Sequence, residues 1–468
     1  MTAAASLVLS ILCLVILFAP RRYALFAIFV GILFLSQRGG IELGGLRMHS
    51  GRLMELAAFI RVVSRRELVA GWFGPIDRAV ILTYSLMTVA YLLRGAFGYG
   101  TSPAVTMTTP MSKIGDLVDI LLVYFSFRGL VHELEDFRWL LRRIIVLLIP
   151  VVLCLAIERS TFSNPLTIFG SVPTVFIDDV DGLRIRCYGA FSHPALLGTL
   201  GAWLAISYAA LVMQKEDRMA GVAGVGLALC IVLYANSGGP LTCLSIGLAG
   251  WACWFVRKRL RLIRIGIVVG LLLLAMVMKD PIWYLPSKMA LVFGGSGWHR
   301  SYLMDQTIRH IGDWWLAGMP LDITASWFGY LMQGAADITN LYVAFGLDGG
   351  LPSLLLLIWL IVVAFRHVGR SMATIEGMKG KARHDPLLMW AIGCGLLLHV
   401  ANYFSTTYFD QTNMLWLFQV AAVAGVSRQI AEQSAAAPAP APAPAPERGG
   451  LKGDPRGAHA RHGFPRRF

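Results

Sequence analysis

The residues best suited to chemistry gather in one polar segment, 279–341, of an otherwise apolar chain. Guanidinium groups pair bidentately with phosphate, and an imidazole or a carboxylate can take a proton from a hydroxyl group. The segment holds five of the 13 tryptophans and these ionisable side chains: His299, Arg300, Asp305, Arg309, His310, Asp313, Asp322 and Asp337. The sequence therefore predicts that this segment contributes to the functional site.

The spacing of residues 301–315 predicts a helix, with Arg300 at its start and directed toward the preceding loop. Arg300 can hold a phosphate or lie at the surface near lipid headgroups. Asp305 and Arg309 stand four residues apart, so Arg309 can bind phosphate or pair with Asp305 on the same helix face. Trp298 fits either an interfacial aromatic belt or a platform for a sugar ring.

A second polar loop, residues 158–189, contains Arg184-Ile-Arg186 shortly before an apolar stretch. Arginines at the lip of a membrane-spanning helix can hold a phosphate, extend toward the interface or pair with nearby aspartates, and the spacing leaves these interpretations open. The run Asp179-Val-Asp181 has the form of a metal-binding pair. So short a motif often occurs by chance, and we expect solvated carboxylates and no metal.

Other polar runs lie where loops meet apolar stretches. Asp337 is a candidate general base, because a carboxylate at the membrane edge is costly to desolvate unless it is used or paired. Capping of the helix that begins at Leu341 is the alternative role. The run 236–240, Asn-Ser-Gly-Gly-Pro, predicts a tight turn, and the run 402–410 predicts a short external loop with no assigned role.

The chain that must position these loops is 56% hydrophobic and 15% charged, with a mean hydropathy of +0.64. This composition excludes a soluble protein and predicts an all-α, polytopic transmembrane helical bundle of about 12–14 spans, since about 20 apolar residues cross a bilayer as a helix. The net charge of +14 is explained by contact with anionic lipid and requires no nucleic acid. Thirteen apolar runs carry the prediction: 3–19, 23–36, 48–63, 79–97, 114–131, 137–157, 190–213, 219–235, 240–256, 262–278, 341–365, 386–402 and 412–427.

Lysine and arginine divide unevenly between alternate loops. One set of loops holds 22 of the 41, whereas the other, longer set holds 12. Basic loops stay in the cytoplasm, so we predict that loops 158–189 and 279–341 face the periplasm. Residues 1–430 then form a transmembrane domain whose large periplasmic loop contains short helices. The tail 431–468, rich in Pro and Ala and then basic, is predicted to be disordered and cytoplasmic.

Three patterns occur in order along the chain. The first is Arg184-x-Arg186-x-x-Gly-x-Phe-x-His-Pro before an apolar run, and the second is Ser237-Gly-Gly-Pro-Leu at the start of another. The third is Gly297-x-x-Arg300, followed by Asn340-Leu-Tyr-x-x-x-Gly-x-x-Gly-Gly-Leu. Together, over roughly residues 75–425, they resemble the O-antigen ligase and O-antigen polymerase superfamily of bacterial envelope proteins.

The resemblance implies a metal-independent, inverting glycosyltransferase of the bacterial inner membrane that uses no cofactor and works on the periplasmic face. Its donor would be an undecaprenyl-diphosphate-linked oligosaccharide, its acceptor a glycan or a lipid, and its surroundings membrane lipids. Transfer to a lipid, as in a ligase, and polymerisation, as in an exopolysaccharide polymerase, both stay open. The C-terminus would be cytoplasmic.

The resemblance also assigns roles to residues. Arg186 and Arg300 match the positions that hold the diphosphate, with Arg184 and Arg309 as nearby substitutes. The family has His-Asn before a span where this chain reads Thr339-Asn340, so the catalytic base has three candidates: Asp337, His299 and His310. The expected substrate contacts are Asn340, Tyr342 and Trp298.

A transporter or flippase of lipid-linked oligosaccharides is the alternative function. Such a carrier places ionisable residues along a path inside its spans, whereas most charges here lie at loop ends. The exceptions are Arg128, Asp116 and Asp119. The sequence therefore favours the enzyme over the carrier.

Overall fold

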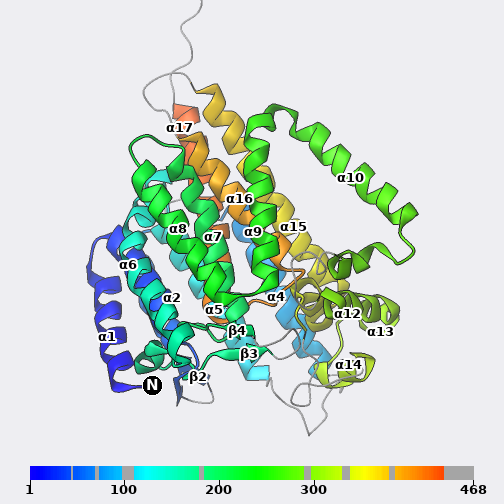
Figure 1. The fold of residues 1–468 in the computed structure, drawn as a ribbon, viewed down its shortest axis with the longest axis horizontal. Helices are drawn as coiled ribbons and strands as arrows, with labels where there is room; N and C mark the ends of the chain where they lie inside the picture. The colour runs from blue at the N-terminus through cyan, green and yellow to red at the C-terminus, as the bar shows by residue number, and fades with distance from the viewer. Residues whose placement is uncertain are drawn as a thin grey trace, which may run out of the picture.

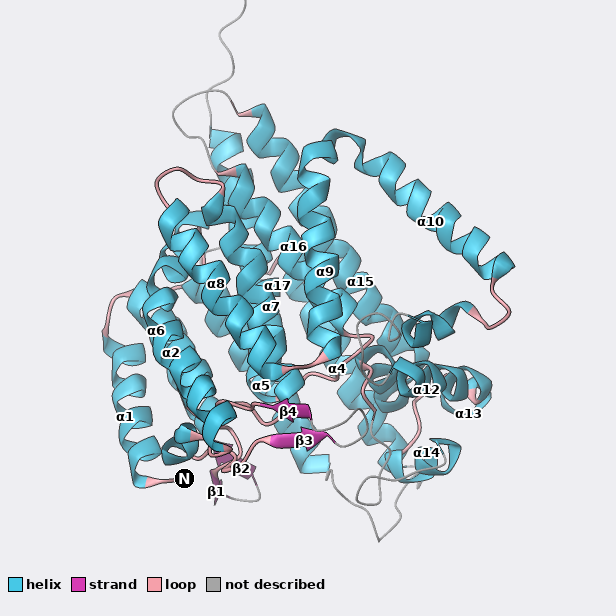
Figure 2. Ribbon diagram, viewed as in Figure 1, coloured by secondary structure: helices cyan, strands magenta, loops and turns pink. Residues whose placement is uncertain are grey.

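The computed structural model describes residues 1–43, 46–68, 73–96, 110–178, 184–288, 297–328, 338–378 and 385–436. About 81% of it is helical, and within these ranges the strands form two antiparallel hairpins (Figure 2). One hairpin joins β1 (Gly40–Leu43) to β2 (Leu46–His49), and the other joins β3 (Phe176–Asp178) to β4 (Arg184–Arg186). The prediction of a helical fold is confirmed.

Each of the thirteen predicted apolar runs contains one long helix. These helices are α1 (Ala3–Phe18), α2 (Arg21–Phe34), α3 (Ser50–Ser64), α4 (Pro75–Ala96), α5 (Pro110–Leu130), α6 (Leu134–Thr161), α7 (Pro194–Val212), α8 (Arg218–Ala235), α9 (Gly238–Ala252), α10 (Leu260–Val277), α15 (Leu341–Gly377), α16 (Pro386–Asn402) and α17 (Asp410–Ala436). The described residues between α10 and α15 include the shorter α-helices α12 (Gly297–Arg309), α13 (Ile311–Trp314) and α14 (Leu321–Phe328), together with a 3-10 helix, Ile282–Tyr284.

Seven helical stretches in the described ranges are long and apolar enough to cross a membrane. They are α4, α6, α7, α8, α15, α17 and one stretch, Gly238–Val277, that joins α9 and α10. Two shorter apolar helices, α1 and α16, accompany them. The chain thus has the helices expected of a membrane protein. The criterion of length and composition selects seven stretches, fewer than the 12–14 spans expected from the sequence, and that larger number stays a prediction.

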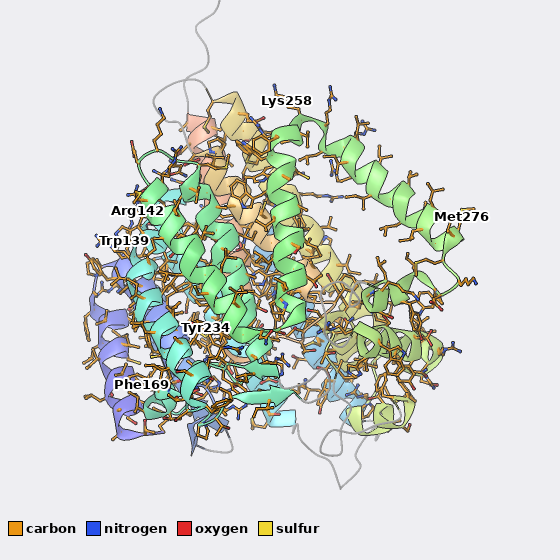
Figure 3. All side chains as sticks on the ribbon, viewed as in Figure 1. Trp139, Arg142, Phe169, Tyr234, Lys258 and Met276 are labelled. Carbon is orange, nitrogen blue, oxygen red and sulfur yellow. The ribbon has the colours of Figure 1, made fainter. Side chains whose placement is uncertain are left out.

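Successive long helices run in opposite directions, so the connections gather at two ends of the bundle (Figure 1). The N-terminus, both β-hairpins and α12–α14 lie at one end, which we call the loop end. The opposite end, where α17 finishes, we call the basic end; Arg142 of α6 and Lys258 between α9 and α10 lie there (Figure 3). The two loop sets separated by charge in the sequence thus lie at opposite ends.

The outside of the bundle is apolar, as a lipid-facing surface must be. On α6 an exposed stripe repeats every three or four residues through Val146, Ile149, Leu153 and Ile157, the spacing of one helix face. Helix α10 stands apart from the bundle and has no buried residue (Figure 2). By contrast, α7 is almost wholly buried and forms the centre of the bundle.

Candidate functional site

Arg186 lies at the end of β4 and is directed toward the turn between α8 and α9. Its register partner in the hairpin is Phe176, and directly opposed residues share one face of a strand pair. The guanidinium carbon stands 5.2 Å from the centre of the Phe176 ring, within cation–π range. Nη2 of Arg186 donates a hydrogen bond to Ser237 Oγ at 3.1 Å. The hairpin therefore delivers Arg186 to the 236–240 turn.

The backbone around β4 is held from two sides. Glu158, fully buried near the end of α6, accepts hydrogen bonds from the amides of Tyr188 at 2.7 Å and Gly189 at 3.0 Å. On the other side, Asn236 Nδ2 donates to the Ile185 carbonyl at 3.2 Å. Asn236 itself ends α8 in the left-handed conformation, with φ at 43°. The predicted tight turn is thus present, and it also anchors the strand that carries the arginine.

Arg300 reaches the same turn from the large loop. Helix α12 begins at Gly297, earlier than predicted, so Arg300 lies in its first turn. Nε of Arg300 donates to the Ser405 carbonyl at 3.2 Å. A Cβ built on Gly239 would lie 2.6 Å from Ser405 Oγ and 3.5 Å from Arg300 Nη2. The arginine therefore lies close against the backbone of the turn, where a side chain would intrude.

Two arginines that are 114 positions apart in the sequence thus converge on one turn. Arg186 donates to Ser237, and Nη2 of Arg300 would stand 3.5 Å from a Cβ on Gly239. The Cα atoms of residues two apart are separated by at most about 7 Å, so both arginines lie beside the same short stretch of backbone. A pair of fixed guanidinium groups is suited to a diphosphate, because each can donate two parallel hydrogen bonds to phosphate oxygens.

Replacing Gly239 by alanine should weaken the binding of inorganic pyrophosphate by about 10-fold, roughly the effect of losing one hydrogen bond to a charged group. The added methyl group would meet Ser405 Oγ and shift Arg300. Gly226→Ala on α8 is the matched control, since no atom lies within 4 Å of a Cβ at that position. Equal pyrophosphate affinity of the two variants would contradict the importance of this close approach.

A third arginine, Arg38, lies beside the site and was not singled out by its sequence. Its Nη2 donates to the Ser192 carbonyl at 2.6 Å, and its guanidinium carbon lies 6.0 Å from the Tyr188 ring centre. The Ser192 hydroxyl in turn donates to the Asp410 carboxylate at the start of α17. The loop that leads to β1 therefore joins the loop that carries Arg186 and, through Ser192, the start of α17, a convergence for which the local sequence gives no signal.

His193, the N-cap residue of α7, is held neutral beside these arginines. Burial, then the charges of Arg186 and Arg38, lower the pKa of His193 from 6.5 to about 4. Its Nδ1 accepts a hydrogen bond from the Ala195 amide at 3.1 Å, so the neutral ring carries its proton on Nε2. At neutral pH His193 is therefore an uncharged hydrogen-bond donor.

Removing one neighbouring cation should raise the pKa of His193. In Arg186→Gln we expect it to move from about 4 toward 6.5, while burial still holds it below the ordinary value. An NMR titration of the labelled histidine ring measures this shift. Arg309→Gln is the control, because the charges that shift His193 do not include Arg309. An unchanged pKa in Arg186→Gln would show that the guanidinium group does not face the imidazole.

The α12–α14 segment is docked on a kink in α15. At the kink Gly350 has φ at 76°, a left-handed conformation that favours glycine. The Leu351 amide donates to the Trp315 carbonyl at 2.7 Å, and the Met319 amide donates to the Leu347 carbonyl at 2.8 Å. A small apolar core completes the contact: Leu303, Trp314, Phe328, Val343 and Leu347. The glycine-rich pattern after Asn340 thus has a structural basis, since it lets another backbone approach.

No family model and no curated protein matches this chain. The resemblance to the O-antigen ligase and polymerase superfamily therefore depends on the sequence patterns themselves. Arg186 of the first pattern donates to Ser237 of the second, and Arg300 of the third lies beside Gly239 of the second.

Two candidate residues of the large loop make local contacts. Arg309 pairs with Asp305, with Nε 2.7 Å from Oδ2, and its side chain is 68% exposed. This pair raises the pKa of Arg309, and Arg309 and Trp283 together lower the pKa of Asp305 against the opposing effect of burial. His310 stacks on Trp327 with ring centres 4.4 Å apart, and its Nδ1 contacts the Gln306 carbonyl.

Four further candidates lie on α12, beside Arg300, and at the start of α15. His299 is half-buried and precedes Arg300 on α12, and Trp298 is exposed and stacks on Tyr302 at 5.1 Å. Asn340 is fully buried and caps α15 by accepting from the Val343 amide at 3.2 Å. The Tyr342 hydroxyl donates to the Val400 carbonyl at 3.0 Å. Tyr342 thus joins α15 to α16, whereas Asn340 caps its own helix.

Some predicted residues cannot be placed. Asp337, Asp179, Asp181 and the tail from residue 437 lie outside the described residues. Arg184 belongs to β4, opposite Asp178 in the register, and its side chain is outside the described parts. Among the residues that the structure describes, no group of three or more His, Cys, Asp or Glu side chains could hold a metal ion.

Proposed function

We propose that this protein is a metal-independent, inverting glycosyltransferase of the bacterial inner membrane that transfers or polymerises undecaprenyl-diphosphate-linked glycans. The observation that carries the proposal is the convergence of Arg186 and Arg300 on one turn at the loop end, where Arg186 donates to Ser237 and Arg300, held by the Ser405 carbonyl, lies beside Gly239. Two arginines that come from different loops and reach one turn can each bind one phosphate group of a diphosphate.

The chemistry explains why guanidinium groups are needed. Breaking the bond between the anomeric carbon and the phosphate oxygen leaves negative charge on the departing diphosphate. Fixed cations in a site with little water stabilise that charge more strongly as the bond breaks, which lowers the barrier. Attack of an acceptor hydroxyl from the opposite face forms the new glycosidic bond with inversion.

A base must take the proton of the attacking hydroxyl. Of the three candidates we place His299 first, because it adjoins Arg300 on α12 and is half-buried. His310 is instead engaged with Trp327 and with its own helix, and Asp337 lies outside the described residues. The exposed Trp298–Tyr302 stack on the same helix offers a flat apolar surface for a sugar ring.

In this proposal all thirteen long helices cross the membrane, with the loop end in the periplasm and the basic end in the cytoplasm. The unequal distribution of Lys and Arg supports this orientation. The exposed α10 and the outer stripe of α6 would face lipid. The polyprenyl chain of the donor would lie in the same apolar surroundings, with only its diphosphate reaching the arginines.

Purified protein in liposomes, supplied with an undecaprenyl-diphosphate oligosaccharide, tests the proposal. Products longer than the donor, or transferred to a lipid acceptor, support the enzyme, and the acceptor distinguishes polymerase from ligase. Movement of the donor between leaflets without bond formation would favour a carrier. Two of the three charged residues noted for a carrier are tied to neighbours: Arg128 to Asp77 at 3.3 Å and Asp119 to Arg52.

A further inference from the structure

A hydrogen-bonded network centred on Asn402 includes Ser405, the residue whose carbonyl accepts from Arg300. Asn402 is the last residue of α16 and is fully buried. Its Nδ2 donates to Thr199 Oγ1 at 2.7 Å and to the Tyr408 hydroxyl at 3.1 Å. Its Oδ1 accepts from Ser405 Oγ at 2.8 Å and from Cys243 Sγ at 3.4 Å. One amide group therefore links α7, α9 and the 403–409 loop.

The direction of these bonds is fixed by the neighbours. The Thr199 hydroxyl donates its only hydrogen to the Ala195 carbonyl at 2.8 Å, so toward Asn402 it can only accept. The amide nitrogen must therefore face Thr199, which leaves the amide oxygen to face Ser405. A carboxylate in place of the amide would meet the Thr199 oxygen with no hydrogen between them. The site thus requires an asparagine at position 402.

Ser405 links Asn402 to Arg300. Its hydroxyl is used by Asn402, and its amide donates to the Asn402 carbonyl at 2.8 Å, which closes a tight turn. The carbonyl of the same residue accepts from Arg300 Nε. The Ser405 hydroxyl also packs against Gly239, on the turn that receives both arginines. Movement of Ser405 would therefore move the partner of Arg300.

We infer that Asn402 is a positioning residue that holds Arg300, through Ser405, in the geometry that grips a diphosphate. The inference deepens the proposed function and depends on it for the identity of the ligand. It gives a role to the 402–410 loop, to which the sequence assigned none. Asn402 touches no substrate in this scheme, and its effect passes only through the carbonyl and hydroxyl of Ser405.

Two single substitutions separate this role from general packing. Ser405→Ala removes the hydrogen bond between Asn402 and Ser405, the residue that holds Arg300. Thr199→Val removes the hydrogen bond on the other side of the Asn402 amide and keeps the shape of the side chain. Each deletes one hydrogen bond to the same amide. With inorganic pyrophosphate as the probe, we expect Ser405→Ala to weaken binding about 5- to 10-fold, the size of one hydrogen bond. Thr199→Val should change pyrophosphate binding by less than about twofold, because the Tyr408 hydroxyl still accepts from the amide nitrogen and keeps the amide oxygen facing Ser405.

Hydrogen–deuterium exchange of the 297–309 peptide provides a readout that needs no ligand. Exchange should become faster in Ser405→Ala and in Asn402→Asp, and stay unchanged in Thr199→Val. Equal effects of Ser405→Ala and Thr199→Val on exchange and on pyrophosphate binding would overturn the inference. Faster exchange in Ser405→Ala together with a wild type that neither binds pyrophosphate nor forms glycosidic bonds would support the positioning role and overturn the proposed function instead.

Discussion

Replacing Arg186 or Arg300 singly by alanine should reduce product formation by at least about 100-fold, the usual cost of removing one fixed donor that stabilises transition-state charge. Each arginine reaches the 236–240 turn from a different loop, so neither can substitute for the other. Transfer from a labelled undecaprenyl-diphosphate oligosaccharide in liposomes measures the loss, and gel filtration in detergent verifies that each variant is folded.

Arg309→Ala is the matched control for these variants. Arg309 carries the same charge on the same helix as Arg300, but it is mostly exposed and pairs with Asp305. Exposed pairs of this kind contribute little to stability, so we expect turnover within about twofold of the wild type. Lysine at position 186 or 300 should recover only part of the activity, because it keeps the charge without the bidentate fork. Full turnover in both alanine variants would remove these arginines from the site.

Replacing Gly350 by alanine should abolish activity by undocking the α12–α14 segment. Gly350 has φ at 76° and ψ at 179°, a region essentially restricted to glycine that costs another residue about 1–3 kcal/mol. The methyl group of alanine would also collide with the Leu316 carbonyl. The hydrogen bond from Leu351 to Trp315 lies beside this contact. We therefore expect turnover to fall by at least about 100-fold, since Arg300 depends on the docked segment for its place.

Gly369→Ala, on the same helix, is the control. No atom lies within 4 Å of a Cβ at Gly369, and alanine in a helix interior is favoured over glycine by about 0.5–1 kcal/mol. This variant should keep full activity and melt at the same or a slightly higher temperature. Limited proteolysis of the 297–328 segment should be faster in Gly350→Ala alone. Resistance of that variant to protease, with activity retained, would show that the α15 kink does not hold the segment.

The sequence by itself determined the helices and their arrangement into two ends. Each apolar run of membrane length became one helix, because a long apolar stretch can satisfy its backbone only by helical hydrogen bonds wherever water is excluded. The excess of Lys and Arg in alternate loops separated the same two sets of loops that the bundle places at opposite ends (Figure 1). The pair of Asp305 and Arg309 was also predictable, since residues four apart on a helix are neighbours.

Only the tertiary structure decided what the candidate site contains. The run 236–240 has the sequence of a turn, yet it receives Arg186 from one loop and the Arg300 segment from another. Arg38 and the Asn402 network join them without any local signal. The physical reason is that helix formation depends on neighbours within a few residues, whereas these contacts join segments far apart in the chain. The packing of the helices decides these long-range contacts, and the spacing of apolar residues along the sequence does not reveal which helices pack together.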